Sequence, residues 1–258
     1  MPTHLVWFRA DLRIHDNFAL AAACRAKDAN VLALFIATPE QWRQHDMAPR
    51  QAALLSAYLN DLQHSLAEKG IPLIYKEAHD FAAQRQTVQA ICQQHAVTHL
   101  YYNYQYEFNE QQRDRQLEKS LAGVVCEGFD DSVMLAPGSV MTGSHEMYKV
   151  FTPFKNAFIK RLKEGLPECV TAPSVRGETI TDLPAIRLNY PQQSFDETVF
   201  PASEKAAIAR LRQFCAQGAA DYEARRDFPA IEGTSRLSAC LALGALSPRQ
   251  CLHRLLAE

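Results

Sequence analysis

The stretch Leu5-Val-Trp-Phe-Arg-Ala-Asp-Leu-Arg13 decides the fold, because a short apolar strand in it runs directly into a polar loop. Five β-branched or aromatic runs are predicted as strands: Leu5–Arg9, Val31–Ile36, Leu73–Lys76, His99–Tyr102 and Val124–Phe129. Helical periodicity occupies the intervals between them, at Asn17–Arg25, Arg50–Glu68, Phe81–His95 and Glu110–Leu121. This alternation predicts an α/β fold: a parallel five-stranded Rossmann-like sheet with flanking helices and right-handed crossovers.

The loop after the first predicted strand contains no glycine between Arg9 and Arg13. A dinucleotide-binding turn needs Gly-x-Gly-x-x-Gly so that the backbone can approach a pyrophosphate, which excludes an NAD-type site here. Ligands of open α/β sheets nevertheless lie beyond the carboxyl ends of the strands, where the strand order reverses. We therefore expect a binding site at that edge, for a ligand other than NAD.

The composition is that of a soluble globular protein, with 47% hydrophobic and 22% charged residues in 258. No apolar window is long enough to span a membrane, and the start is not that of a secretory signal. The seven cysteines are scattered and form no Cys-x-x-Cys pair, which indicates reduced thiols in the cytoplasm. Because the net charge is −2, any nucleic-acid surface must be a local basic face.

The periodic pattern ends near Gly165, and five prolines are spread from there to Pro201. Periodicity returns at Ser203–Cys215, and Ser247 is predicted to cap a last helix with Pro248 at its first position. We divide the chain into an α/β domain at 1–135, a connection at 136–202 and the start of a helical domain at 203–258. The apolar faces of these last helices lack partners, so we expect the chain to end inside that domain.

The second part contains the stretch Gly233-Thr-Ser-Arg-Leu-Ser238, directly before an apolar helical run. Its hydroxyl-bearing residues are Thr234, Ser235 and Ser238. Hydroxyls beside the free N–H groups of a helix start suit an anion such as a phosphate, and Arg236 adds a fixed charge. Leu237 and Leu241 are one turn apart and are predicted to attach this helix to the core. The alternative is an ordinary capped helix, since Ser and Thr are common caps.

Another informative stretch, Asn103-Tyr-Gln-Tyr-Glu-Phe-Asn-Glu110, follows the fourth predicted strand, where an α/β sheet places a ligand. The amide of Asn109 and the carboxylate of Glu110 suit the amino-pyrimidinone edge of a pterin. Alternatively, Asn109 caps the next helix and Glu110 favours its first turn.

Hydrolytic and metal chemistry have little support in the sequence. His145-Glu146 is followed by Lys149 where a zinc helix needs its second histidine, and no Gly-x-Ser-x-Gly elbow occurs. We interpret Asp130-Asp131 as solvated or helix-capping carboxylates, and His15-Asp16 as part of a turn and helix cap. No catalytic residue and no metal ligand is predicted.

Two long stretches resemble the DNA photolyase and cryptochrome superfamily. Leu5 to Asn17 resembles its opening, while Tyr222-Glu-Ala-Arg-Arg-Asp-Phe-Pro, Gly233–Ser238 and Leu-Ser-Pro-Arg249 resemble the start of its flavin-binding helical domain. The resemblance covers the whole chain, but the chain covers only about the first half of the family's usual length.

The resemblance is closest to bacterial folate-type class I photolyases, and it implies light-driven repair of cyclobutane pyrimidine dimers in DNA by a monomeric lyase. In such proteins 5,10-methenyltetrahydrofolate absorbs light and passes excitation to reduced FAD, which donates an electron to the dimer. By resemblance, the FAD contacts are Tyr222, Thr234, Ser235, Arg236, Leu237 and Ser238. Asn109 and Glu110 resemble folate contacts, as does His45, and Arg226 resembles a DNA-phosphate contact.

Two alternatives remain open at this point. One is a cryptochrome-type blue-light photoreceptor, which binds flavin without repair; the other is a free-standing pterin- or nucleotide-binding α/β module. Asn109-Glu110 favours repair over signalling. The rest of the family's flavin pocket and its tryptophan chain lie beyond Glu258, and both tryptophans here, Trp7 and Trp42, fall in the predicted antenna domain. We therefore expect the 258-residue chain alone to hold no stoichiometric FAD and to be inactive.

Overall fold

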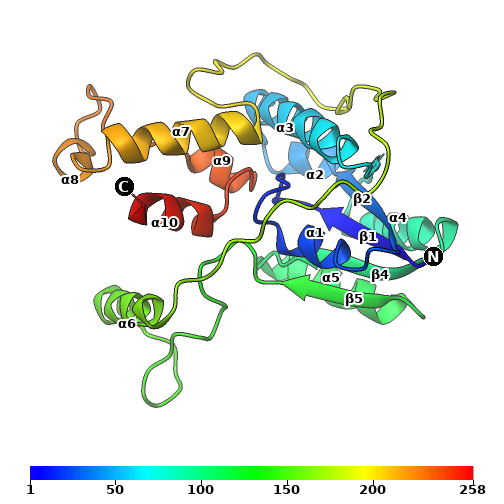
Figure 1. Cartoon of the computed structure of the whole chain (residues 1–258), viewed down its shortest axis with the longest axis horizontal. Helices are drawn as coiled ribbons and strands as arrows, with labels where there is room; N and C mark the ends of the chain where they lie inside the picture. The colour runs from blue at the N-terminus through cyan, green and yellow to red at the C-terminus, as the bar shows by residue number, and fades with distance from the viewer. Residues whose placement is uncertain (258) are drawn as a thin grey trace.

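The computed structural model describes residues 1–257 and contains a five-stranded sheet in the order β3-β2-β1-β4-β5 (Figure 1). The strands are β1 (Thr3–Phe8), β2 (Asn30–Ala37), β3 (Leu73–Glu77), β4 (Val97–Asn103) and β5 (Val125–Phe129). All four pairings are parallel, and β1 runs in register with β2 from Thr3 opposite Asn30 to Phe8 opposite Phe35. The predicted α/β fold and its five strands are therefore confirmed.

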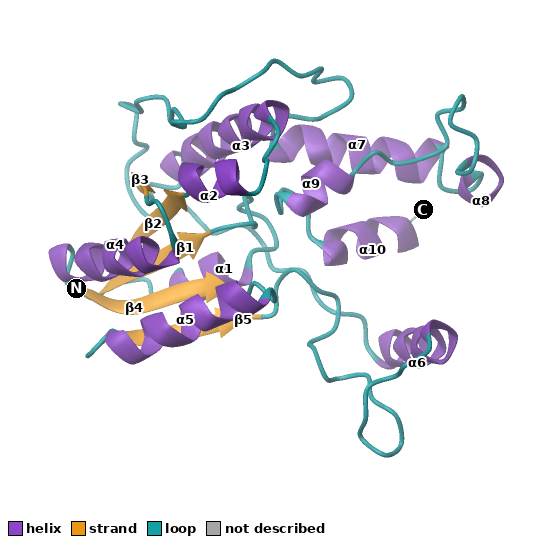
Figure 2. Ribbon diagram, turned by 180° about the vertical axis from the view of Figure 1, so that it is seen from behind, coloured by secondary structure: helices purple, strands orange, loops and turns teal. Residues whose placement is uncertain are grey.

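Helices cover both faces of this sheet (Figure 2). They are α1 (Phe18–Ala23), α3 (Pro49–Ala67), α4 (Phe81–Gln94) and α5 (Phe108–Ser120), close to the predicted ranges. Side chains alternate along a strand, so Val6 and Phe8 pack with α1 and α3, while Leu5 and Trp7 pack with α4 and α5. Two apolar cores result, one on each side, as expected for a buried parallel sheet.

One short helix of this domain, α2 (Pro39–Gln44), was not predicted. It has six residues and begins with Pro39 at its first position, so it is too short to show helical periodicity. Its Trp42 packs edge-on against Tyr190, with ring centroids 5.8 Å apart. Helix α2 thereby contacts the connection between the two parts, which is distant from it in sequence.

The segment between the two parts contains a helix and then a long stretch without helix or strand. Helix α6 (Phe151–Glu164) has no buried residue and stands away from the rest of the chain in both views (Figures 1 and 2). Farther on, the Arg176 guanidinium donates to the carbonyls of Ala26 at 2.6 Å and Ala29 at 2.8 Å. Ile186 is buried in the core beside α3. The proline-rich region after α6 is thus fixed to the α/β domain by specific contacts.

The last part contains helices α7 (Glu204–Gln217), α8 (Tyr222–Arg225), α9 (Ser238–Ala242) and α10 (Pro248–Leu256). Ser247 caps α10, as predicted, and Ser203 caps α7; each side chain accepts from the N–H three residues on. Ala207 and Leu211 of α7 are buried in the same core as α3. This packing attaches the helical part to one face of the sheet domain.

Candidate functional site

A cleft of about 520 Å³ lies between α7 and the loop that precedes α9. Thr234, Ser235 and Arg236 line the loop side, and Arg210 and Phe214 line the α7 side. Neither the Thr234 nor the Ser235 side chain makes a hydrogen bond within residues 1–257, so both hydroxyls are available to a ligand. Two guanidinium groups and two hydroxyls form a donor set that suits a phosphate.

The approach of this loop to α8 depends on a glycine. A Cβ on Gly233 would lie 2.7 Å from the backbone of Arg225, which no real side chain tolerates. Next to it, Arg236 has a positive φ of 52° and forms an ion pair with Glu232 at 3.1 Å. Both partners are exposed, so this pair contributes little to stability and does not prevent Arg236 from meeting an anion.

The predicted helix start at this loop is wrong in its details. Helix α9 has only five residues, and its N-cap is Leu237, which supplies no side-chain hydrogen bond. The hydroxyls of Thr234 and Ser235 therefore do not cap it, and Ser238 is its first residue. Leu237 is buried, as predicted, but Leu241 is 40% exposed, which contradicts the prediction that both attach the helix to the core.

Tyr222 and Arg226 lie together beside this cleft, on α8 and at its end. The Tyr222 ring packs edge-on against Phe214, with centroids 6.1 Å apart, and is 41% exposed. The Arg226 guanidinium lies 5.8 Å from the centre of the Tyr222 ring and forms a long ion pair of 3.7 Å with Asp227. The arginine is thus half exposed and available to a partner at the rim.

The residues expected to hold an antenna lie on different elements. Asn109 and Glu110 are in the first turn of α5; Asn109 is exposed, and the N-cap is Glu107, so a capping role for Asn109 is wrong. His45 is exposed at the end of α2. Because β1 lies between β2 and β4, His45 reaches the carboxyl edge on the other side of β1 from the α5 pair. Within the described residues, no hydrogen bond or ion pair joins His45 to Asn109 or Glu110.

A smaller pocket of about 180 Å³ opens at the switch point of the sheet, where β1 neighbours β4. Asp11 and Tyr104 line it, together with Leu241 of α9, so it also borders the helical part. Burial raises the pKa of the Asp11 carboxyl, which nevertheless accepts hydrogen bonds from the Arg9 N–H at 2.6 Å and from Asn103 at 2.6 Å. This pocket is where the strand order predicted a ligand.

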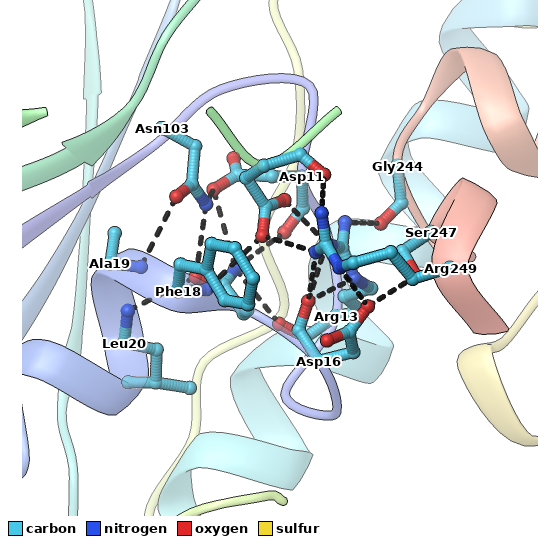
Figure 3. Close-up of polar contacts among 12 residues, drawn as sticks. Asp11, Arg13, Asp16, Phe18, Ala19, Leu20, Asn103, Gly244, Ser247 and Arg249 are labelled. Atoms are coloured by element: carbon cyan, nitrogen blue, oxygen red, sulfur yellow. Dashed lines mark hydrogen bonds and ion pairs between the residues drawn. The ribbon is translucent and has the colours of Figure 1, made fainter. Parts of the chain in front are cut away.

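The sequence did not reveal a buried cluster of charges that joins the two parts of the chain (Figure 3). Arg249 of α10 binds Asp16 and Asp131, at 2.9 Å each, and Arg13 also pairs with Asp131. All four side chains are at most 2% exposed. Ser247 adds a hydrogen bond from its hydroxyl to Asp16. Each buried carboxylate thus has an arginine partner and further donors, as a buried charge requires.

This cluster corrects two interpretations made from the sequence. Asp131 is not solvated but fully buried, although it does cap α1 by accepting from the Phe18 N–H at 3.1 Å. Asp16 belongs to a turn with a φ of 52°, as expected, but its carboxylate serves the contact with α10. Three members, Arg13, Asp16 and Arg249, lie in the stretches that carried the family resemblance. Only that resemblance, and no local pattern, could have drawn attention to them.

A second contact joins α7 to the same β1–α1 loop. The Glu204 carboxylate accepts from the backbone N–H groups of Ile14 at 2.9 Å and His15 at 3.1 Å. It also lies 2.9 Å from the His15 imidazole. The backbone N–H of Glu204 in turn donates to Asp61 of α3 at 2.9 Å. His15 therefore belongs to an interdomain ion pair, which the turn interpretation did not include.

This ion pair predicts a pH dependence. The hydrogen bond to Glu204 raises the pKa of His15 above its ordinary value, although burial and nearby Lys69 oppose it. A raised folded-state pKa stabilises the fold fully below the unfolded value of about 6.5, and this contribution is lost as the pH rises through the folded pKa. His15→Gln should therefore lose stability at pH 5.5 relative to the native chain, with the difference shrinking by pH 8.5.

Urea unfolding at a series of pH values measures this difference. His45→Gln is the control, because within residues 1–257 His45 has no carboxylate at ion-pair distance. A constant difference between His15→Gln and the native chain from pH 5.5 to 8.5 would contradict the prediction.

The described residues contain no cluster of three or more His, Cys, Asp or Glu that could hold a metal ion. Among the same residues, no helix is long and apolar enough to cross a membrane. No disulfide joins the seven cysteines. The candidate site comprises the cleft beside α7 and the pocket at the sheet edge, and Asp131 of the charge cluster also lines that pocket.

The structure thus combines a parallel α/β domain with a helical part, and buried ion pairs join the two at the carboxyl edge of the sheet. The family model described as DNA photolyase matches residues 4–173. The chain belongs to the DNA photolyase family.

Similar proteins cover the chain completely. It is 68% identical over 260 residues to a deoxyribodipyrimidine photo-lyase of Salmonella typhimurium and 67% identical over 259 residues to one of Escherichia coli. Both alignments include 100% of this chain and 55% of the relative, so the chain spans about half the length of these proteins.

Solved structures with the same fold include a Synechocystis cryptochrome, with a TM-score of 0.82 and 26% identity over 98% of this chain and 55% of that one. A class III photolyase from Agrobacterium tumefaciens matches with a TM-score of 0.73 and 23% identity, over 98% and 53%. The second likeness concerns the fold alone.

Proposed function

We propose that this chain is part of a deoxyribodipyrimidine photolyase, a carbon–carbon lyase that repairs cyclobutane pyrimidine dimers in DNA under light. The observation that carries this proposal is the identity of 67–68% along the whole chain to relatives that bear that name. Residues 1–135 serve as the antenna domain, 136–202 as the connection and 203–258 as the start of the FAD-binding domain. The protein acts as a monomer in the cytoplasm.

The cleft beside α7 is the proposed place for the phosphates of FAD. The free hydroxyls of Thr234 and Ser235 and the Arg236 guanidinium support this, because they converge on one hollow. Tyr222 stands at the rim, whereas Leu237 is buried and Ser238 is not among the residues that line the cleft. Bound flavin supplies the light-driven electron transfer, and the chain's own residues hold and orient it.

Contacts from this chain alone are too few to retain the cofactor. Each phosphate hydrogen bond contributes about 0.5–1.5 kcal/mol net, while immobilising the ligand costs an estimated ~4–15 kcal/mol. We expect the purified 258-residue chain to carry no stoichiometric FAD, and a chain of the relatives' full length to carry it. Absorbance spectra of the two purified proteins test this.

Repair itself is tested by illuminating an oligonucleotide that contains one thymine dimer with the full-length protein and reduced FAD. We expect the dimer to disappear in the light and to persist in the dark. A flavin-loaded protein that leaves the dimer intact under light would overturn the proposal and favour a photoreceptor.

The proposed antenna is 5,10-methenyltetrahydrofolate, held by Asn109 and Glu110 with His45 as a further contact. Glu110 is half-buried in the first turn of α5, where a carboxylate can accept from the amino edge of a pterin. Glu110→Ala removes a charge-assisted hydrogen bond of roughly 1.5–3 kcal/mol, so the affinity for folate should fall about tenfold or more and the folate occupancy of the purified protein should decrease.

Folate and flavin absorbance of the full-length protein measure this change, and flavin content should stay constant. Glu127→Ala is the control, because Glu127 is an exposed carboxylate of β5 and is not among the residues that line the sheet-edge pocket. Equal folate occupancy in Glu110→Ala and the native protein would leave Glu110 with only its helix-stabilising role.

Arg226 is the proposed contact to a DNA phosphate, since its guanidinium is half exposed beside the cleft. A phosphate contact does not distinguish one base from another, so Arg226→Ala should weaken the binding of damaged DNA and of undamaged DNA by similar factors. The slope of log affinity against log salt should shrink by roughly 0.7–0.9.

Titration of the full-length protein with both DNAs at several salt concentrations checks this. Arg161→Ala serves as control, because Arg161 is equally exposed but lies on the distant helix α6. A loss confined to damaged DNA would mean that Arg226 contacts the lesion itself.

A further inference from the structure

The two walls of the cleft are attached to one short loop of the α/β domain, residues 9–17 between β1 and α1. The α7 wall is held at its first residue, Glu204, whose carboxylate accepts from the N–H groups of Ile14 and His15 at 2.9 and 3.1 Å. The Glu204 side chain is only 7% exposed, so these bonds are shielded from water. Residues 14 and 15 thus hold the first turn of α7 in place against the α/β domain.

The opposite wall, Thr234–Arg236, leads through α9 into residues 243–249, and these residues are held by the same loop. The Leu12 N–H donates to the Leu243 carbonyl at 3.1 Å, and the Arg13 guanidinium donates to the Gly244 carbonyl at 2.9 Å. Five residues after Gly244, Arg249 forms a buried ion pair with Asp16 of the same loop (Figure 3). The second wall is therefore anchored within the loop as well.

These anchors leave little freedom because they are buried and tightly packed. A Cβ on Gly244 would lie 2.5 Å from the Asp11 Cα and 2.6 Å from the Ala10 carbonyl carbon, so the two backbones are in direct contact. Ala10 and Asp11 also line the pocket at the sheet edge. One loop therefore lines part of the sheet-edge pocket and contacts the two segments that carry the walls of the cleft, at Glu204 of α7 and at residues 243–249.

We propose that residues 9–17 are a positioning element that holds the two segments carrying the cleft walls and fixes the spacing of these walls, so that a change at one anchor also reaches the other wall. Such an element holds the cleft in its binding shape before the ligand arrives, which lowers the ordering cost of binding. The inference rests on the proposed function only for the identity of the ligand.

Hydrogen exchange of the 258-residue chain, followed by mass spectrometry, tests this coupling without any ligand. Glu204→Gln weakens the anchor of α7 and should raise amide exchange about tenfold in α7 and also in residues 234–246, which Glu204 does not contact. Arg249→Met removes the arginine partner of the buried Asp16 and one of the two arginine partners of Asp131, and should raise exchange about a hundredfold in residues 234–246, and also in α7.

Arg176→Met is the matched control. It also removes a guanidinium that donates to several carbonyls, of Cys24, Ala26 and Ala29, but none of these lies in residues 9–17. We expect faster exchange near residues 24–29 and no change at the cleft walls.

Two results would overturn the proposal: effects of Glu204→Gln and Arg249→Met confined each to its own wall, or a uniform increase that includes the amides of β1 and β4. If Arg249→Met does not fold, the milder Glu204→Gln still decides between these outcomes. Failure of the full-length protein to bind FAD would refute the proposed function but would leave the exchange pattern, and hence this inference, unaffected.

Discussion

Asp131→Asn should lower the free energy of unfolding by about 3–5 kcal/mol, because it removes one partner from a buried charge cluster. Asp131 is fully buried and pairs with both Arg13 and Arg249. An asparagine keeps the shape but offers a neutral oxygen and an NH₂ group that would face two guanidinium donors. One buried positive charge would then lack its counterion.

Urea unfolding followed by circular dichroism measures this loss, with an unchanged m-value as evidence that the unfolded state is the same. Asp130→Asn is the matched control, since Asp130 is half-buried and accepts one hydrogen bond, from the Tyr106 hydroxyl at 2.7 Å. That variant should cost about 0.5–1.5 kcal/mol. Equal losses in the two variants would show that the charge cluster contributes no more than a single hydrogen bond.

The sheet could be predicted because its signal is local. Each strand is a short β-branched or aromatic run whose neighbours in sequence are loops and periodic helices, so the five strands are recognisable one at a time. The helix ranges of α3 and α4 follow from the spacing of their own apolar residues in the same way. Helix α2 was missed because six residues are less than two turns, too few for a stripe to form.

The loop before α9 was mispredicted because tertiary contacts decide which of its apolar residues are buried. Cys240 and Leu246 take the core positions, and Gly244, with a φ of +66°, ends the helical run soon after it begins. The side chain of Leu241 therefore stays at the surface, where it lines the pocket at the sheet edge. Periodicity over a single turn cannot distinguish these arrangements.

The charge cluster lay outside the reach of local reasoning for a different reason. Arg249 meets Asp16 across 233 residues and Asp131 across 118 residues. Ion pairs of this kind produce no periodic pattern in the sequence. A buried and paired Asp or Arg cannot be distinguished there from one at the surface. Arg13, Asp16 and Arg249 lie in the stretches that carry the family resemblance. Only the folded structure, however, shows that they belong to one charge cluster.

Gly244→Ala should destabilise the chain by roughly 2–5 kcal/mol, since a left-handed backbone and a close contact both act against the new methyl group. Gly244 has a φ of +66°, where an L-residue costs about 1–2 kcal/mol. The added Cβ would also approach the Ala10 carbonyl carbon to 2.6 Å, and the neighbouring atoms are backbone, which cannot rotate away. Residues 243–249 would have to move off the β1–α1 loop.

Gly123→Ala separates these two terms, because Gly123 has a φ of +77° but a Cβ there would meet nothing within 4 Å. It should cost only the conformational ~1–2 kcal/mol. Urea unfolding of both variants gives the steric term as the difference between them. Because the contact lies at the junction, Gly244→Ala should also speed amide exchange in residues 234–246 well beyond Gly123→Ala. Equal stability and equal exchange in the two variants would mean that the loop and the helical part are not held in the close contact on which the cleft's geometry depends.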